Sequence, residues 1–492
     1  MTALLLVLVP LVASLIVFFI RNQRAKIFAL IFSLVQLGLG LYVVWQFNPL
    51  GGLQFENNLS WIPSAGIGFH LGIDGLSIIP LLLTIFVTPF IILSAFGRDF
   101  ERPNVFYGLI LLMQASLVGV FTAQSAFAYY LFWEGALIPV YFLAAIWGGE
   151  NRIRVTFKFF IYTVFGSLLM LISLVYLYMQ TPANHSDEAQ VFYLLGLNST
   201  TQQFIFWGLF VAFAIKMPIF PFHTWQPDTY TESPTPATML LSGIMLKMGI
   251  YSLYRWLMPV VPMAFFENSF LVMMLAIIGL VYGAIIAIQQ QDIKRLLAYS
   301  SFSHVGLMVA GIFTFQQVAL QGAMVQMLAH GINVVGLFFV VDMIERQTNT
   351  RNLSDLGGIT QSAPFLTVLF AILMLGSVGL PLTNGFVGEL LLLNGIVRAY
   401  FNDPAFAVGI GAVAGLTLIF GAVYMLRLFQ GAMFGEKTAV VAGFREINFS
   451  EAMVLVPLCV MVLLMGVLPN LFLKLSEPAV KDLLDFVIPR IR

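Results

Sequence analysis

The sequence is poor in charged residues. Of its 492 residues only 9 % are Asp, Glu, Lys or Arg, against roughly 25 % in an ordinary soluble domain. Hydrophobic residues make up 60 % and the mean hydropathy is +0.94, so a soluble protein of this length would lack the polar surface it needs. Basic and acidic residues balance at 23 each, so no net field attracts a polyanion. The composition therefore excludes soluble, disordered and nucleic-acid-binding proteins and favours a polytopic membrane protein.

Cysteine and the common catalytic motifs are also scarce. Cys459 is the single cysteine, whereas a disulfide needs two and a cysteine-ligated iron–sulfur cluster needs four. The sequence contains no phosphate-binding loop, dinucleotide fingerprint, zinc signature or nucleophile elbow. These absences leave the charged residues inside the membrane as the main source of chemistry.

Long apolar stretches are what the sequence has in abundance. A helix of about 20 residues crosses about 30 Å of hydrocarbon, and stretches of this kind predict an all-α membrane protein with about fourteen spans. They cover approximately 3–20, 27–46, 76–97, 105–123, 125–148, 155–180, 202–221, 235–258, 268–289, 292–314, 317–343, 362–400, 405–429 and 451–471.

The basic residues of the loops predict the orientation. Fifteen lie in odd-numbered connections: Arg21, Arg24, Lys26, Arg98, Arg102, Arg152, Arg154, Lys158, Lys294, Arg295, Arg346, Arg351, Arg427, Lys437 and Arg445. Six lie on the opposite side: Arg255, Arg398, Lys474, Lys481, Arg490 and Arg492. We therefore expect the odd loops in the cytoplasm and both termini outside. His70 and His185 fall in outside loops and are expected to be solvated, and the tail beyond Lys474 predicts a short amphipathic helix at the interface.

Two predicted spans are interrupted by proline and polar residues. The seventh ends in a run from Lys216 to Asp228 with three prolines, and the twelfth contains Pro381 and Asn384 before Glu389. Since lipid-facing helices avoid such residues, we expect broken helices 7 and 12. Each break falls in the fourth span of a five-span set, spans 4–8 and 9–13, and this predicts two inverted five-helix repeats. The predicted domains are 1–104 (three helices), 105–258 (first repeat), 268–429 (second repeat) and 430–492 (last span and tail).

Six ionisable residues fall near the centres of predicted spans: Glu134, Lys216, Lys247, His304, His330 and Glu389. A charge there costs about 2.5–3.5 kcal/mol on insertion scales. One interpretation is that these groups only join helices through ion pairs. The sharper hypothesis is a relay of groups that each bind and release a proton, in which Glu134 modulates Lys216 and the two histidines act as links.

The histidines also allow other interpretations. Two histidines on adjacent spans can ligate a haem, but the paired spacing typical of such proteins is absent. His223, beside the break in the seventh span, is either a structural hydrogen-bond donor or part of an access path. The sequence alone leaves these two roles of His223 open.

Several motifs resemble one known family. They are Phe132-Trp-Glu134 through Trp147-Gly-Gly, Lys158-Phe-Phe-Ile-Tyr-Thr163, Lys216-Met-Pro218 through Asp228, Glu232-Ser-Pro234, Leu246-Lys247-Met-Gly249 and Asp292-Ile-Lys294-Arg295. Together they resemble the antiporter-like membrane subunits of respiratory complex I, from about residue 65 onward. Within this family the chain is similar to the M-type subunits, equivalent to mitochondrial chain 4. At the position of Glu389 these carry Glu, whereas L, N and Mrp-type chains typically carry Lys.

The resemblance implies a function and a role for each buried group. Glu134 and Lys216 are expected to be the modulating charge pair, Lys247 the central proton carrier, His304 and His330 the bridge to the second half, and Glu389 the terminal group. The implied function is proton translocation coupled to quinone reduction by NADH. By the same resemblance the chain binds no cofactor or metal, because NADH, FMN, iron–sulfur clusters and quinone belong to partner subunits.

The implied partners are L-type and N-type antiporter-like chains and small membrane chains, in the bacterial inner (plasma) membrane. Alternatives are a subunit of an Mrp-type cation/proton antiporter, the M-like chain of a photosynthetic relative, and a passive assembly scaffold. Glu389 argues against the antiporter, and the motifs separate the photosynthetic relative poorly.

Overall fold

The computed structural model describes residues 1–20, 22–182, 185–399 and 404–491. Arg21 and Arg492, which were counted among the loop charges, lie outside the described residues, as does residue 400 at the end of the predicted twelfth span.

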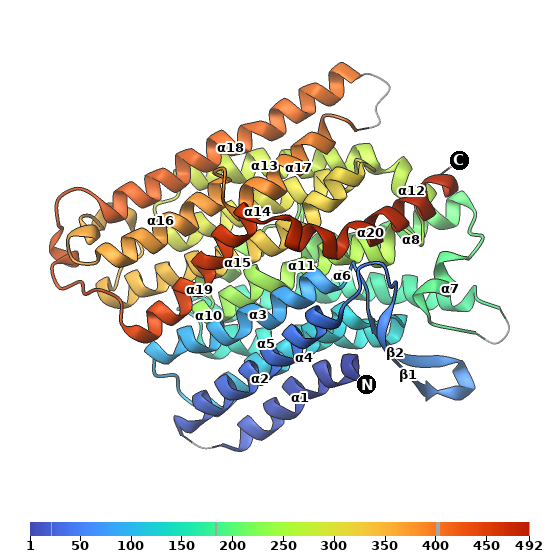
Figure 1. Ribbon diagram of the computed structural model, residues 1–492, viewed down its shortest axis with the longest axis horizontal. Helices are drawn as coiled ribbons and strands as arrows, with labels where there is room; N and C mark the ends of the chain where they lie inside the picture. The colour runs from blue at the N-terminus through green and yellow to red at the C-terminus, as the bar shows by residue number, and fades with distance from the viewer. Residues whose placement is uncertain (21, 183–184, 400–403, 492) are drawn as a thin grey trace.

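Long helices form most of the structure and lie side by side in one bundle (Figure 1). The helix α1 at one edge packs against α4, and α18 at the opposite edge packs against α13. The long helices are α1 (Thr2–Phe19), α2 (Arg24–Gln46), α3 (Ile78–Ser94), α4 (Pro103–Thr122), α5 (Ala126–Trp147), α6 (Arg152–Met179), α8 (Ser199–Lys216), α13 (Ser269–Gln289), α14 (Ile293–Ile312), α15 (Gln317–Thr348), α18 (Pro404–Met433), α19 (Phe449–Val467) and α20 (Asn470–Val487). Shorter helices are α7 (Ala189–Tyr193), α9 (Gln226–Glu232), α10 (Thr235–Leu240), α11 (Leu246–Ser252), α12 (Pro262–Glu267), α16 (Pro364–Val378) and α17 (Asn384–Ile396).

Eleven helices in the described part of the chain are long and apolar enough to cross a membrane. They include the segment Thr235–Leu257, in which α10 and α11 are joined by a π-helical turn (Leu241–Met245). The other three predicted spans correspond to α8, α14 and the pair α16–α17. The helical membrane fold is as predicted, whereas the count of fourteen and the inverted repeats stay predictions.

The connection between α2 and α3 adds a feature that the sequence analysis did not predict. It folds into an antiparallel hairpin of β1 (Gln54–Ile62) and β2 (Ile67–Ile73). Both ends of the chain lie at the same end of the bundle as this hairpin (Figure 1). The orientation of the termini across the membrane stays a prediction.

The amphipathic helix predicted in the tail is α20, and it packs against α3 and α15. Gln321 of α15 donates from Nε2 to the carbonyl oxygen of Leu473 (2.7 Å) and to Ser476 Oγ (3.1 Å). These bonds fasten α20 to the central helix of the bundle.

Candidate functional site

Lys247 lies at the centre of the bundle, one residue into α11. It is fully buried, and its Nζ donates to the carbonyl oxygen of Ser242 (2.7 Å). Nζ also lies 2.9 Å from Nδ1 of His330 on α15. The preceding π-helical turn (Leu241–Met245) contains Ser242, and such turns occur often at functional sites. The structure thus places the predicted central lysine directly against one predicted histidine.

A second contact joins two more of the six predicted groups, the half-buried His304 and the buried Glu389. His304 of α14 places Nδ1 3.2 Å from Oε1 of Glu389 on α17. Gln326 of α15 donates from Nε2 to the same carboxylate oxygen over 3.4 Å. The histidine and the carboxylate are therefore neighbours, although they lie 85 residues apart in the sequence.

The two contacts form one line. The rings of His304 and His330 have their centroids 5.8 Å apart, so Lys247, His330, His304 and Glu389 follow one another across α11, α15, α14 and α17. Nε2 of each histidine and Oε2 of Glu389 have no hydrogen-bond partner among the described residues. Buried polar atoms are normally satisfied, so these three atoms are the ones along the line that can take a further hydrogen bond.

Glu134 and Lys216 are arranged differently. No contact within 4.0 Å joins them in the described residues, and Oε1 of Glu134 and Nζ of Lys216 both lack a hydrogen-bond partner there. Lys216 is buried, and its ammonium nitrogen lies 5.2 Å from the centroid of the Trp133 ring. A cation over an indole face is stabilised by the ring quadrupole. The predicted pair is therefore not a direct ion pair in this conformation, and Trp133 contacts the lysine instead.

The helix α8 ends at Lys216 for a local reason. Pro218 follows two residues later and has no N–H to continue the helix. The freed carbonyl of Ile215 accepts from the indole Nε1 of Trp225 (3.0 Å). His223, in the same break, stacks on Phe302 with ring centroids 4.4 Å apart, and its Nδ1 has no partner among the described residues.

The break between α16 and α17 has its own cap. Gly379 adopts a left-handed conformation with φ of +74°, and the N–H of Leu380 donates to the carbonyl of Leu375 (3.1 Å). This is the pattern of a Schellman cap, in which glycine avoids the steric penalty of positive φ. A Cβ at Gly379 would lie 2.3 Å from Oε2 of Glu389. The break therefore brings the backbone against the terminal carboxylate.

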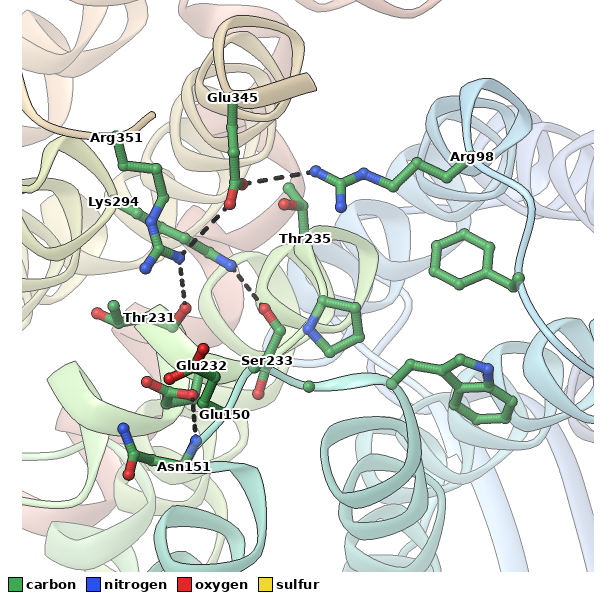
Figure 2. Close-up of a pocket in the computed structure, with 15 residues that line it drawn as sticks. Arg98, Glu150, Asn151, Thr231, Glu232, Ser233, Thr235, Lys294, Glu345 and Arg351 are labelled. Atoms are coloured by element: carbon green, nitrogen blue, oxygen red, sulfur yellow. Dashed lines mark hydrogen bonds and ion pairs between the residues drawn. The ribbon is translucent and has the colours of Figure 1, made fainter. Parts of the chain in front are cut away.

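A polar pocket of about 470 Å³ lies at the end of the bundle that carries the odd-numbered loops. Figure 2 shows Glu345 pointing toward both Arg98 and Arg351, while Lys294 reaches Ser233. A second cavity, of about 510 Å³, adjoins it and contains the ion pairs of Asp228 with Lys158 (3.1 Å) and Arg295 (3.2 Å).

Two basic residues assigned to loops by the sequence analysis are buried. Lys294 is 2 % exposed and donates from Nζ to the carbonyl of Ser233 (2.6 Å). Arg255 pairs over 2.5 Å with Asp74, which directly follows the β1–β2 hairpin. Both lie within a few residues of a helix end, so apolar periodicity could not separate them from loop charges.

The expectation that His70 is solvated is wrong. His70 is 9 % exposed, because its Nδ1 lies 2.8 Å from Glu188 and its Nε2 lies 3.2 Å from Glu56. The hydrogen bond to Glu188 is the main cause that raises the pKa of His70 above its ordinary value, and burial opposes it. His185, the other outside histidine, is exposed as predicted.

No group of three or more His, Cys, Asp or Glu side chains that could hold a metal ion occurs within the described ranges. The chemistry that the buried line offers is proton exchange among a lysine, two imidazoles and a carboxylate.

Comparisons with known proteins find relatives among the membrane subunits of quinone oxidoreductase and antiporter complexes. The family described as NADH:quinone oxidoreductase/Mrp antiporter, TM matches residues 123–416. The NADH-quinone oxidoreductase subunit M of Rickettsia prowazekii is 35 % identical over 488 residues, which cover 97 % of both chains. The F(420)H(2) dehydrogenase subunit M of Methanosarcina mazei is 36 % identical over 95 % of this chain and 94 % of its own. A chain of the respiratory complex I from Thermus thermophilus with bound NADH superposes with a TM-score of 0.91 at 29 % identity, covering 99 % of this chain and 100 % of that one.

Proposed function

The chain belongs to the NADH:quinone oxidoreductase/Mrp antiporter family of membrane proteins, and on that premise we propose that it is the M-type proton-translocating subunit of a respiratory NADH–quinone oxidoreductase. The single observation that carries the proposal is the buried line of Lys247, His330, His304 and Glu389, which joins α11 to α17. Likeness over nearly the whole length to subunits of that name supports it. The proposed domains are those set out from the sequence, a three-helix segment, two repeats and a tail.

In the proposed mechanism Lys247 is the central proton carrier. Its neutral form accepts a proton, and the ammonium then passes one to His330, whose Nδ1 is 2.9 Å away. His304 receives it across the gap between the two rings, and Glu389 is the terminal acceptor at 3.2 Å. Water at the unpartnered Nε2 atoms completes the hydrogen-bonded path.

Glu134 and Lys216 act as the modulating pair. Because they are not in contact here, Lys216 is in a released state, with its ammonium over Trp133. Approach of Glu134 would favour the charged form of Lys216 and weaken the hold of Lys247 on its proton by like-charge repulsion. The driving change comes from quinone reduction in partner subunits.

The proposed setting is the bacterial inner membrane, with the odd loops and the 470 Å³ pocket in the cytoplasm and the β1–β2 hairpin outside. The chain serves a translocase, and its own residues supply no redox centre. Its partners in the membrane arm are L-type, N-type and smaller membrane chains.

Replacing Lys247 by Ala tests the proposal. The variant removes the carrier while leaving the helix intact, so we expect assembly and electron transfer to persist and most proton pumping by the assembled complex to be lost. Protons translocated per NADH oxidised, measured in membrane vesicles, are the readout. A normal ratio in Lys247→Ala would overturn the proposal and favour a passive scaffold.

The electron donor is a separate question, because a relative named for F(420)H(2) dehydrogenase is as similar as those named for NADH. Isolation of the whole complex and assay with each donor separates the two. An Mrp-type antiporter would instead purify without flavin- and iron–sulfur-bearing chains.

A further inference from the structure

The break between α9 and α10 leaves the carbonyl groups of Thr231, Glu232 and Ser233 without helical donors, because the backbone is extended at Ser233 and Pro234. Pro234 and Pro236 have no N–H, so the helical bonds to the carbonyls of Tyr230 and Glu232 cannot form. The Tyr230 carbonyl accepts from Thr238 Oγ1 within the same segment (2.8 Å). The sequence Glu232-Ser233-Pro234-Thr235-Pro236 thus predicts a strained junction unless outside groups satisfy it.

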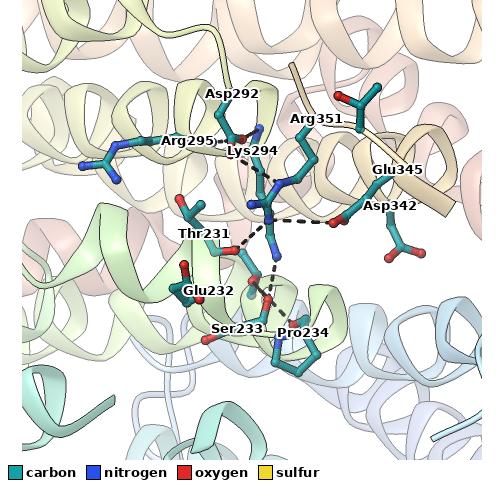
Figure 3. Close-up of polar contacts among 12 residues, drawn as sticks. Thr231, Glu232, Ser233, Pro234, Asp292, Lys294, Arg295, Asp342, Glu345 and Arg351 are labelled. Atoms are coloured by element: carbon teal, nitrogen blue, oxygen red, sulfur yellow. Dashed lines mark hydrogen bonds and ion pairs between the residues drawn. The ribbon is translucent and has the colours of Figure 1, made fainter. Parts of the chain in front are cut away.

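Each of the three carbonyls accepts a hydrogen bond from a different element. Arg351 Nη1 donates to Thr231 (3.0 Å), the N–H of Gly149 donates to Glu232 (2.8 Å), and Lys294 Nζ donates to Ser233 (2.6 Å). Figure 3 shows Arg351 and Lys294 converging on this junction from the same side. The break is therefore held by three separate parts of the chain.

These donors belong to the elements that carry the buried relay. Gly149 follows α5, which contains Glu134. Lys294 lies in the first turn of α14, which contains His304, and Arg351 follows α15, which contains His330. The junction itself continues through α10 and the π-helical turn (Leu241–Met245) to Lys247.

Lys294 is more buried than Arg351, the other side-chain donor. Its side chain is 2 % exposed, and the backbone at its own position is fixed by Asp292, whose Oδ1 accepts from Lys294 N (2.8 Å). Oδ2 of the same Asp292 lies 3.3 Å from Nε of Arg351. One carboxylate thus orients both cationic donors toward the break.

The pocket beside the junction leaves room for movement. Its cavity of about 470 Å³ is lined by Thr231, Ser233 and Lys294. Ser233 can therefore shift if its donor is lost, and α10 with the π-helical turn would carry the shift as a continuous helical rod to Ser242, whose carbonyl holds Lys247.

We propose that Lys294 is a positioning residue, whose ammonium clamps the α9–α10 break at the Ser233 carbonyl and so sets the contact of Lys247 with His330. This inference rests on the proposed function, since it assigns the clamp a purpose in proton translocation. Lys294 touches neither Lys247 nor His330 among the contacts of the described residues and acts through the backbone.

The test uses the intact complex with Lys294→Met, Lys294→Arg and a control, Lys437→Met. Lys437 donates to Ser362 Oγ on the same end of the bundle, away from the break. Two quantities are measured for each: hydrogen exchange of the amides of α10 (Thr235–Leu240), and protons translocated per NADH oxidised. The loss of a hydrogen bond to a charged donor predicts exchange about tenfold faster or more in Lys294→Met.

We expect Lys294→Met to exchange faster and to pump fewer protons per electron, Lys294→Arg to restore both, and Lys437→Met to match the parent. Unchanged exchange in Lys294→Met overturns the clamp, and faster exchange with normal pumping overturns its link to translocation. If Lys294→Met does not assemble, Lys294→Gln replaces it: the Gln side chain is uncharged and one bond shorter, so its amide falls short of the Ser233 carbonyl and the same expectations apply. Failure of the proposed function is distinguishable, because it appears as normal pumping in Lys247→Ala.

Discussion

At the scale of single residues, the buried ionisable groups differ in how their charge is balanced. Lys247 contacts His330, His304 contacts Glu389, and the rings of the two histidines lie 5.8 Å apart. Among the contacts of the described residues, Lys216 Nζ has no hydrogen-bond or ion-pair partner and lies 5.2 Å from the centroid of the Trp133 ring. Burying a charge without a partner is costly, so Lys216 is the group whose state is most sensitive to the position of Glu134.

The contacts of His70 predict that the stability of the β1–β2 hairpin depends on pH. The pKa of His70 is raised in the folded chain, chiefly by the hydrogen bond to Glu188. This contact therefore stabilises the hairpin fully at pH values below the unfolded pKa of about 6.5. The stabilisation is lost as pH rises through the folded pKa. We expect the amides of β1 and β2, corrected for the intrinsic pH dependence of exchange, to lose protection as pH rises through that window. His70→Gln should remove this dependence.

If the protection of these amides varied with pH equally in the parent and in His70→Gln, a stabilising contact between His70 and Glu188 would be contradicted. His185→Gln is the matched control, since His185 is exposed and its replacement should leave the hairpin's pH dependence unchanged.

At the scale of elements, the α9–α10 and α16–α17 breaks interrupt helical hydrogen bonding and satisfy the freed backbone groups by different means. The α9–α10 break borrows donors from three neighbouring elements, whereas the α16–α17 break caps itself through Gly379. A buried backbone group without a partner costs free energy comparable to a lost hydrogen bond, so each break needs its own solution. The second solution depends on one residue type.

Gly379→Ala tests that dependence. A non-glycine residue at φ of +74° costs about 1–2 kcal/mol, and the new Cβ would lie 2.3 Å from Oε2 of Glu389. We expect a less heat-stable complex and fewer protons translocated per NADH, because the carboxylate must move away from His304.

Gly415→Ala in α18 is the matched control, because nothing lies within 4 Å of a Cβ there and the backbone is helical. It should leave pumping unchanged and, if anything, raise stability by about 0.5–1 kcal/mol. Equal behaviour of the two variants would show that the cap at Gly379 is unimportant.

At the scale of the whole molecule, three long-range contacts join segments that the relay does not itself connect. The hairpin is held to the α6–α7 connection by His70 and Glu188, α20 is fastened to α15 by Gln321, and Arg255 is paired with Asp74 just before α3. The hairpin and both termini lie at one end of the bundle (Figure 1). These three contacts therefore fasten the hairpin, the tail helix and the segment before α3 to other parts of the chain.

Asp74→Asn tests how much the ion pair between Asp74 and Arg255 contributes to stability. The amide oxygen keeps the capping bonds that Asp74 Oδ1 accepts from Leu76 and Ser77, but Arg255 is left buried without a counter-charge. Breaking a buried pair from one side costs about 3–5 kcal/mol, so we expect the thermal dissociation midpoint of the complex, followed on native gels, to fall. Glu267→Gln, at an exposed outer site, should change stability by no more than about 0.5 kcal/mol. Identical midpoints for the two variants would contradict a structural role for the pair.

Apolar length and loop charge, which are local properties of the sequence, determined the helical membrane fold, the approximate limits of the spans and the two interruptions by proline and glycine. The scarcity of charge also singled out the six buried groups, because each stands alone in an apolar stretch. Lys294 and Arg255 escaped this reasoning, since residues at helix ends resemble loop residues whether they face water or protein.

Only the tertiary structure decided which of those groups meet. Lys247 and His330 are 83 residues apart and come within 2.9 Å because α10 and the π-helical turn before α11 pack against α15, whereas Glu134 and Lys216 stay apart. The burial of His70 and the clamp on the α9–α10 break likewise depend on segments brought together from distant parts of the chain. The reason is physical: hydropathy and helix periodicity act over one or two turns, while contact between charged side chains is set by the packing of whole helices against one another.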